Sequence, residues 1–314
     1  MTPKKMMKSS IYRIFSILPE SKNKEKIRKI GATKFQKYLY NDILNDISKL
    51  EIINSGIKDN LPFVKLKDGS IFYGHFPNKT KELLYNNLPE KTKNKLEKKS
   101  MQVAIDIVNR FKKKDIKQKY YKVKPGDTVL EAGAYLGFYT IKLAKEVGPS
   151  GKIIAIEALE DNFNILKRNI IANNIKNIVL INKAIWSSCK TLPFYINARH
   201  DKKQGNSLFK IRKSEQKKYK EIKTETIDNI IKKLKLNRID FTIIEINGAE
   251  VEALKGADKS LEIVKNLVVA APYKTGKEKN YINIKDILSE RKFNTKVEYR
   301  PGSHKIGTIY GNKK

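Results

Sequence analysis

Cysteine, arginine and long apolar runs are scarce in this chain of 314 residues, and each scarcity excludes a class of protein. The single cysteine, Cys189, cannot form an internal disulfide. The sequence has no CxxC pair and no Cys/His cluster, so we expect no zinc or other metal site. This cysteine usage is typical of a reducing compartment, and we expect a cytoplasmic protein. No apolar run reaches the roughly 20 residues that a membrane-spanning helix needs.

The net charge of +33 is the strongest bias of the composition. Whether it predicts a negatively charged partner depends on which basic residues carry it and where they lie. Only nine of the 66 basic residues are arginine, the residue best suited to bidentate contacts with phosphates and bases. The lysines are spread along the whole chain together with abundant Ile and Asn, as A/T-biased coding would produce. Composition drift is therefore favoured, and binding to a polyanion such as nucleic acid, or to a membrane surface, stays open as the alternative. For the basic amphipathic residues 1–19, core packing is favoured over peripheral contact with a membrane.

The first 120 residues differ in patterning from the rest. We expect residues 1–120 to be a Lys-rich, mainly helical extension that caps the substrate. Within it, apolar residues at helical spacing predict a helix over 34–53, and residues 79–119 are mostly helical in pattern. Between them, Asp68-Gly69 separates two apolar runs and predicts a β-hairpin over 63–73.

Residues 121–314 form the second predicted domain, in which short apolar strands alternate with amphipathic helices. This alternation predicts an α/β fold with a parallel sheet covered by helices on both faces, followed by a terminal antiparallel pair. Right-handed crossovers make such a sheet doubly wound, and its ligands bind at the carboxyl ends of the strands. The predicted strands cover 128–134, 152–158, 177–185, 192–196, 239–246, 266–271, 295–299 and 305–310, and the helices cover 138–147, 161–174, 226–236, 250–257 and 284–292.

The first of these strands ends in an acid and a glycine turn, Glu131-Ala132-Gly133-Ala134-Tyr135-Leu136-Gly137. Gly133 allows a tight turn where a side chain would meet a ligand, and Gly137 lets the next helix begin close to the strand. A dinucleotide site needs G-x-G-x-x-G, and Tyr135 stands at the second glycine position. Glu131 would also repel a pyrophosphate. The loop therefore predicts a ligand with a cationic amino-acid group and no phosphate.

A second carboxylate, Glu157, ends the next strand about 20 residues after the glycine turn, where an acid binds the hydroxyls of a ribose. An amino-acid cation at one strand end and a ribose at the next describe S-adenosylmethionine. Ala184, near the end of the third predicted strand, is small enough for an adenine ring to approach. Simple strand packing explains Ala184 equally well.

An ordered series of segments resembles the FkbM family of methyltransferases. It begins with 123–140 (VKPGDTVLEAGAYLGFYT), continues through 147–157 (VGPSGKIIAIE) and includes 239–250 (IDFTIIEINGAE). The resemblance covers roughly residues 120–300. It implies the class I methyltransferase fold, a Rossmann-like, doubly wound sheet of seven mostly parallel strands, with S-adenosylmethionine as cofactor. It also implies O-methylation of a hydroxyl on a sugar, a glycan or another small-molecule acceptor.

Two residues are the candidates for catalysis. Glu245, at the carboxyl end of a central strand, is placed to act as the base for an acceptor hydroxyl and to contact the cofactor. His75 directly follows the predicted hairpin and could reach over the site. His200 lies in a polar loop, where a lone histidine is usually incidental. Glu250 is best explained as an acid in the first turn of a helix.

Four residues depart from the family pattern, and they keep two alternative functions open. The departures are Tyr135, Ala158, Ile243 and Asn247. A nucleic-acid methyltransferase would fit the charge, and Ala271-Pro272-Tyr273 partly resembles the catalytic turn of such enzymes. That segment follows the fifth strand rather than the fourth, and it lacks the amide or acid that binds the target amine. A binding protein that keeps the fold without activity fits the departures, although the retained strand-end acids and glycines argue against it.

Overall fold

A computed structural model describes residues 52–75, 89–111, 117–195, 208, 219–271, 274–275, 278–299 and 306–313. Contacts divide the chain into two units, Met1–Asn54 and Ser55–Lys314, and the second contains nearly all of the described residues. The predicted helix over 34–53 lies outside the described residues except at its end. There the prediction is wrong, because Ile52 and Ile53 begin a strand. The segment 1–19 and the loop with His200 also lie outside the described residues.

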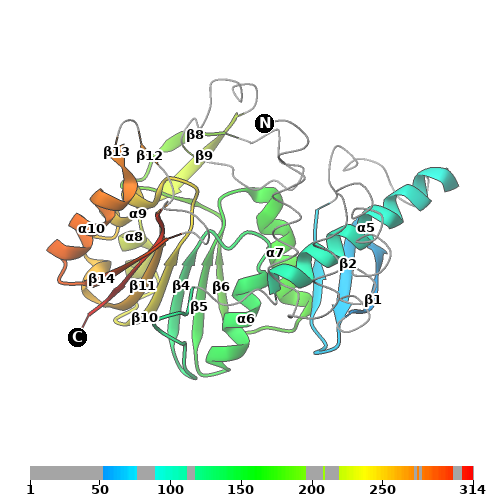
Figure 1. The fold of residues 1–314 in the computed structure, drawn as a ribbon, viewed down its shortest axis with the longest axis horizontal. Helices are drawn as coiled ribbons and strands as arrows, with labels where there is room; N and C mark the ends of the chain where they lie inside the picture. The colour runs from blue at the N-terminus through cyan, green and yellow to red at the C-terminus, as the bar shows by residue number, and fades with distance from the viewer. Residues whose placement is uncertain are drawn as a thin grey trace, which may run out of the picture. The chain divides into compact units, whose positions relative to one another are not determined.

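Seven strands form the central sheet, in the order β14-β15-β11-β10-β4-β5-β6 (Figure 1). The pairs from β11 to β6 are parallel, whereas β15 runs antiparallel to both β11 and β14. This order confirms the expected class I methyltransferase fold. The strands are β4 (Thr128–Ala132), β5 (Lys152–Ile156), β6 (Ile178–Ile181), β10 (Ile239–Ile244), β11 (Val264–Ala270), β14 (Asn294–Tyr299) and β15 (Ile306–Asn312).

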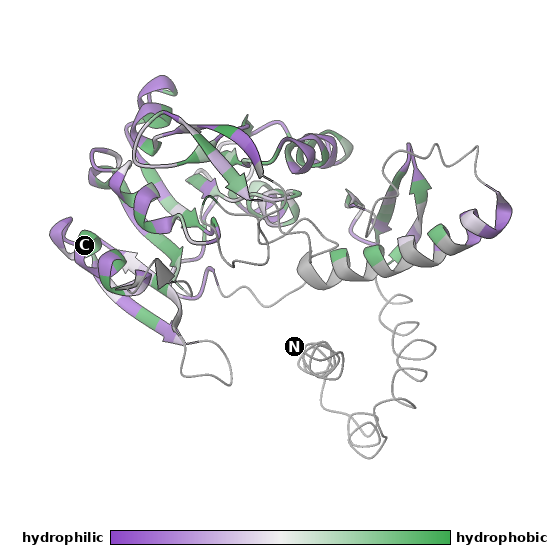
Figure 2. Cartoon of the chain, turned by 90° about the horizontal axis from the view of Figure 1, so that it is seen from above, coloured by the Kyte–Doolittle hydropathy of each residue, from purple (hydrophilic) through white to green (hydrophobic). Residues whose placement is uncertain are grey.

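The central strands form because they are runs of β-branched and other apolar residues that are buried on both faces. In β10 every residue is buried, and in β5 every residue after Lys152 is buried. Figure 2 shows the consequence, with mainly hydrophobic strands and helices that carry both hydrophobic and hydrophilic residues. The core therefore lies between the sheet and the helices.

The helices of this domain agree with the predicted ones to within a few residues. Thr226 caps α8 by accepting a hydrogen bond from Asn229 N–H at 3.0 Å, and Gly148 ends α6. Among the helices that the structure describes, none combines the length and apolarity needed to cross a bilayer. The helices are α6 (Phe138–Val147), α7 (Glu160–Ala172), α8 (Ile227–Lys233), α9 (Glu250–Lys255) and α10 (Asn280–Glu290), with a 3-10 turn η5 (Ser260–Glu262).

The third predicted strand, 177–185, is wrong as a single element. It divides into β6 and a short strand, β7 (Ala184–Ile185), because the side chain of Asn182 donates to the backbone carbonyls of Glu157 and Ala158. β7 pairs with β9 (Tyr219–Glu225), which in turn pairs with β8 (Thr191–Tyr195). β9 was not predicted because its sequence, YKEIKTE, is mostly polar and has no apolar run typical of a strand.

The predicted hairpin is confirmed as β2 (Leu61–Leu66) and β3 (Ile71–Tyr73), joined to β1 (Ile52–Lys58) in a three-stranded sheet. In its turn, Gly69 has φ 81° and Asp68 accepts hydrogen bonds from the backbone and hydroxyl of Ser70. α5 (Glu90–Phe111) lies against β2 and supplies the helix expected within 79–119. A two-residue pair, β12 (Lys274–Thr275) and β13 (Glu278–Lys279), completes the described elements.

Candidate functional site

The loop after β4 bends sharply at the carboxyl edge of the sheet. Gly133 has φ 95° and Gly137 has φ 83°, both in the left-handed region that favours glycine. The backbone N–H groups of Gly133 and Ala134 donate to the carbonyl of Ile156 at 2.9 and 3.0 Å, which fastens the loop to β5. A Cβ on Gly133 would collide with the backbone carbonyl of Glu245, because the end of β10 lies directly beside the loop. This position therefore requires glycine.

Tyr135 continues the bend with φ 55°, a conformation that costs a non-glycine residue about 1 kcal/mol. Its N–H donates to Glu157 Oε2 at 2.9 Å. Its ring stands edge-on to Phe138, with the ring centroids 6.2 Å apart. The hydrogen bond couples the glycine loop directly to the acid that follows β5.

Glu157 is only 8% exposed, and the protein itself binds most of its carboxylate. Oε1 accepts hydrogen bonds from Leu159 N–H at 3.0 Å and from the side-chain amide of Asn162 at 3.1 Å. With the Tyr135 bond to Oε2, three of roughly four acceptor positions are taken. Burial raises the pKa of Glu157 to about 7, although the three hydrogen bonds favour the ionised form. One acceptor position, on Oε2, is left for a ligand.

Two asparagines, one on α7 and one at its C-cap, bind the backbone of the hairpin as a neighbouring strand would, with one donated and one accepted hydrogen bond each. Asn173 accepts a hydrogen bond from Ile71 N–H at 3.0 Å and donates to Ile71 O at 2.6 Å. Asn169, which is fully buried, makes the same pair of bonds with Tyr73 at 2.6 and 3.1 Å. Asn169 also donates to Leu136 O at 2.8 Å, within the glycine loop. The hairpin is thus fixed to the same helix that borders the loop.

A third asparagine of α7 connects His75 to Glu157. Asn162 Oδ1 lies 2.9 Å from Nε2 of His75, and both side chains are buried. The amide nitrogen of Asn162 donates to Glu157, so Oδ1 is the acceptor and Nε2 of His75 carries the proton. The structure therefore places His75 at the Glu157 end of the site, in contact with a residue that holds Glu157.

Glu131 lies within β4 and is 1% exposed. Its Oε2 accepts a hydrogen bond from the Thr140 hydroxyl at 2.6 Å. Burial raises the pKa of Glu131; Lys117 opposes this shift, and Glu245 adds to it. Glu131 in turn contributes to the raised pKa of Glu157, so the two acids lie close enough to interact across neighbouring strands.

Glu245 directly follows β10, and its side chain is 55% exposed. Its N–H donates to Ala132 O at 3.0 Å, which holds it beside the end of β4. Lys117 Nζ lies 2.9 Å from Glu245 Oε2 and 4.6 Å from the ring centroid of Tyr139. Since Lys117 also acts on Glu131, these charges form one cluster at the carboxyl ends of two neighbouring central strands. A solvent-accessible carboxylate fixed by a lysine can receive a proton there.

Glu250 is fully buried and stabilises the turn between β10 and α9. It accepts hydrogen bonds from Ile246 N–H at 3.0 Å and Gly248 N–H at 2.8 Å. Burial raises its pKa to about 8. The same turn holds Asn247 at φ 56°, one of the departures from the family pattern. Glu250 therefore shapes the loop beside Glu245.

The remaining expected residues lie as follows. Ala184 is buried in β7, outside the central sheet, and it follows Asn182 and Lys183 after the end of β6. Ala271 follows β11, whereas Pro272 and Tyr273 lie outside the described residues. Within the described ranges, no group of three or more His, Cys, Asp or Glu side chains could hold a metal ion.

The sequence reasoning gave no role to Lys117 or to the asparagines of α7 and its C-cap. Asn162, Asn169 and Asn173 are spaced by seven and four residues, so they share one helix face with the buried Leu166. Amides on the buried face of a helix are a signal for specific hydrogen bonds, because unpaired buried amides are costly. Lys117 lies in a Lys-rich stretch and had no comparable signal.

A model of the methyltransferase FkbM domain matches residues 131–294, just over half of the chain. The matched span begins at Glu131 and contains the glycine loop, Glu157 and Glu245. This chain belongs to the FkbM family of methyltransferases.

Relatives of this FkbM methyltransferase include the methyltransferase sdnD of Sordaria araneosa, 26% identical over 170 residues. That alignment covers 45% of the present chain and 64% of sdnD, so the chain matches less than two thirds of this relative. Among solved structures, the FkbM methyltransferase of Methylobacillus flagellatus is similar with a TM-score of 0.45 and 14% identity, covering 67% of this chain and 54% of that one. Aeropyrum pernix fibrillarin with bound S-adenosylmethionine has a TM-score of 0.41 and 13% identity, covering 83% and 99% of the respective chains.

The resemblance to this family implies S-adenosylmethionine as the cofactor. The chemistry of the chain's residues fits this cofactor. Burial raises the pKa values of Glu131 and Glu157, and a cationic ligand beside them would offset the cost of ionising buried acids. The free position on Glu157 Oε2 suits a hydroxyl donor.

Proposed function

We propose that this methyltransferase transfers the methyl group to a hydroxyl of a small-molecule or glycan acceptor. The observation that carries the proposal is the position of Glu245. It is a half-exposed carboxylate beside the buried acid of β4, and Lys117 holds it at 2.9 Å. A hydroxyl acceptor needs a group that takes its proton as the new bond forms, and Glu245 is suited to that role.

Cofactor binding is assigned to the loop and the two strand-end acids. Glu157 accepts a ribose hydroxyl on the free position of Oε2. The N–H of Tyr135 holds Oε2 and the amide of Asn162 holds Oε1, so the whole carboxylate is kept in place. The acid of β4, Glu131, attracts the cationic part of the cofactor. The backbone of three loop residues lies along the cofactor, namely Gly133, Ala134 and Gly137. Ala184, after the end of β6, is assigned to the adenine ring.

The bound cofactor supplies a methyl group on a positively charged sulfur, which a nucleophile can displace. The chain positions the acceptor in line with that group and provides the base. Glu245 takes the hydroxyl proton on a carboxylate oxygen, and Lys117 orients the carboxylate through their ion pair. His75 acts at a distance from this proton transfer, because it holds Asn162 and thereby Glu157.

Two broader expectations belong to the same proposal. The hairpin that presents His75 caps the site and contributes to acceptor recognition. The reaction takes place in the cytoplasm, which is consistent with a single free cysteine, Cys189.

The test is methyl incorporation from radiolabelled S-adenosylmethionine into separated acceptor classes: glycans, small polar metabolites and nucleic acids. We expect label in a hydroxyl-bearing small molecule or glycan, as an alkali-stable ether. Glu245→Gln keeps a side-chain oxygen that can still contact the cofactor, so it should lose this incorporation and keep its affinity for the cofactor. Label found only in nucleic acid, or full incorporation by Glu245→Gln, would contradict the proposal.

A further inference from the structure

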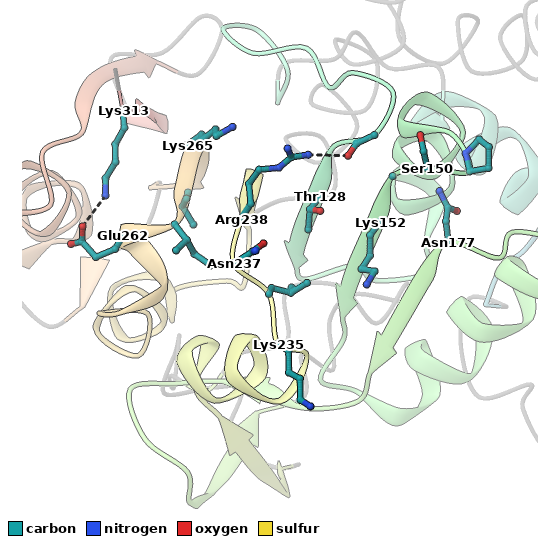
Figure 3. A pocket seen from close by; sticks show the side chains of 16 residues that line it. Thr128, Ser150, Lys152, Asn177, Lys235, Asn237, Arg238, Glu262, Lys265 and Lys313 are labelled. Atoms are coloured by element: carbon teal, nitrogen blue, oxygen red, sulfur yellow. Dashed lines mark hydrogen bonds and ion pairs between the residues drawn. The ribbon is translucent and has the colours of Figure 1, made fainter.

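A cavity of about 1090 Å³ lies at the opposite edge of the central sheet from the cofactor site (Figure 3). Its lining includes Thr128 at the start of β4, Lys152 at the start of β5, Arg238 just before β10 and Val264 at the start of β11. These are the amino ends of strands whose carboxyl ends carry Glu131, Glu157 and Glu245. A ligand in this cavity therefore does not compete with the cofactor.

Basic side chains dominate the cavity. Five cations line it, against one carboxylate, Glu262; the cations are Lys152, Lys235, Arg238, Lys265 and Lys313. They come from four separate chain segments, so the folded structure gathers charges that are dispersed in the sequence. The neighbouring polar groups are hydroxyls and amides, those of Thr128, Ser150, Asn177 and Asn237.

Part of this charge is neutralised within the protein. Asp240 pairs with Arg238 at 2.9 Å and with Lys265 at 3.3 Å. Glu262 pairs with Lys313 at 3.5 Å (Figure 3). Arg238 also donates to the backbone carbonyl of Gly126 at 3.2 Å. The acids thus hold three of the cations in fixed positions on the cavity wall.

Two cations remain without an acidic partner in the part of the chain that the structure describes. Lys152 and Lys235 are exposed, and neither forms an ion pair with a described residue. Lys235 is fixed by its backbone, with φ 53° and its N–H bonded to Lys232 O at 3.1 Å. A cavity with surplus positive charge and neutral donors favours a ligand that carries several negative charges.

We propose that this cavity binds the phosphodiester backbone of a nucleic acid, independently of methyl transfer. Lysines are point charges that suit phosphate contacts without base recognition, so binding is expected to depend little on sequence. A small-molecule pocket would be mostly apolar, which this cavity is not. A membrane surface fits less well because the site is concave. The large hydrophobic side chains that are exposed in the described residues all lie outside its lining: Ile53, Tyr120, Ile171, Ile282 and Tyr299.

The experiment measures binding of the full chain to labelled 12-nucleotide oligo(U) RNA and oligo(dT) DNA by fluorescence anisotropy at several salt concentrations. The test variant is Lys152→Glu with Lys235→Glu. The matched control changes the same charge at two exposed lysines on α7 and α10, Lys167→Glu with Lys285→Glu. We expect binding about tenfold weaker in the cavity variant and within about threefold of wild type in the control. The slope of log affinity against log salt should fall by about 1 to 2 in the cavity variant.

Thermal unfolding and cofactor affinity, which both variants should retain, show that the folded protein is being compared. If the cavity variant unfolds, the milder pair Lys152→Gln with Lys235→Gln replaces it. Equal losses in the cavity and control variants, or no binding by wild type, would overturn the proposal.

A second arm of the experiment measures binding to vesicles of phosphatidylcholine and phosphatidylserine. Vesicle binding that the cavity variant loses, with oligonucleotide binding unchanged, would assign the cavity to membranes and overturn the nucleic-acid proposal.

Discussion

His75 reaches Glu157 through a single intervening side chain, that of Asn162. The hydrogen bonds are 2.9 Å from His75 Nε2 to Asn162 Oδ1 and 3.1 Å from the Asn162 amide to Glu157 Oε1. His75 donates to Asn162, and Asn162 donates to Glu157. The two hydrogen bonds therefore connect the end of the hairpin to the acid that follows β5. The hairpin is part of the cofactor site through this connection.

Removing the imidazole should weaken cofactor binding without slowing the chemical step. His75→Ala leaves Asn162 with one fewer partner, and we expect a cofactor Kd about threefold to tenfold higher, the effect of one lost hydrogen bond. At saturating cofactor, kcat should stay near the wild-type value. His75→Gln, which can still donate, should recover most of the affinity. Lys67→Ala, an exposed change in the same hairpin, is the control. A large fall in kcat with an unchanged Kd would instead make His75 catalytic.

Cofactor affinity should increase with pH between about 6 and 8. Burial raises the pKa of Glu157 to about 7, so the unliganded protein binds a proton there below neutral pH. The ionised form accepts the ribose hydroxyl, and binding therefore releases that proton. From pH 8 to pH 6 the affinity should fall about tenfold. Glu157→Gln cannot titrate and should give weaker binding with a flat profile in this range. A wild-type profile that is flat, or that rises toward acid, would contradict the role of Glu157.

Turnover should depend on the pair formed by Glu245 and Lys117. Glu245→Gln removes the base, and we expect kcat to fall about a hundredfold or more. Lys117→Met frees the carboxylate from its partner at 2.9 Å and should reduce kcat by about tenfold. Lys119→Met is the matched control, because Lys119 pairs with Glu298 at 2.5 Å, away from this cluster. Full turnover in Glu245→Gln would show that another group takes the proton.

Gly133 and Gly69 form a natural comparison, because both have positive φ, 95° and 81°. Gly69→Ala meets open space and should lower the free energy of unfolding by about 1 kcal/mol, through backbone strain alone. Gly133→Ala adds a collision with the Glu245 carbonyl, which should cost about 1–3 kcal/mol more. Denaturant unfolding measures both, and cofactor titration should show a loss only for Gly133→Ala. Equal destabilisation by the two changes would remove the steric argument.

The sequence predicted the central sheet well because its strands are buried runs whose pattern depends little on distant contacts. Helix α6 was found from the helical spacing of its buried residues. β9 could not be predicted, because its polar residues become a strand only through pairing with β7 and β8. The division of the third strand at Asn182 likewise depends on carbonyls that reach it from the loop after β5.

The candidate site was predictable only in part, again for physical reasons. Glu157 and the glycine turn follow from strand ends, which sequence patterns locate. The partners of these residues come from distant segments: Asn162 links to His75 across 87 positions. Lys117 reaches Glu245 from a segment in which lysine is too common to attract notice. Such pairings are set by tertiary packing rather than by local pattern.

The central claim is that Glu157 binds the cofactor at the end of β5, and calorimetric titration with S-adenosylmethionine at pH 8 tests it most directly. The titration compares wild type, Glu157→Ala and Glu160→Ala, the last an exposed acid three positions further on. We predict saturable binding by wild type, an unchanged Kd for Glu160→Ala and a Kd at least about tenfold higher for Glu157→Ala. Equal affinity of the folded Glu157→Ala variant and wild type would contradict the account.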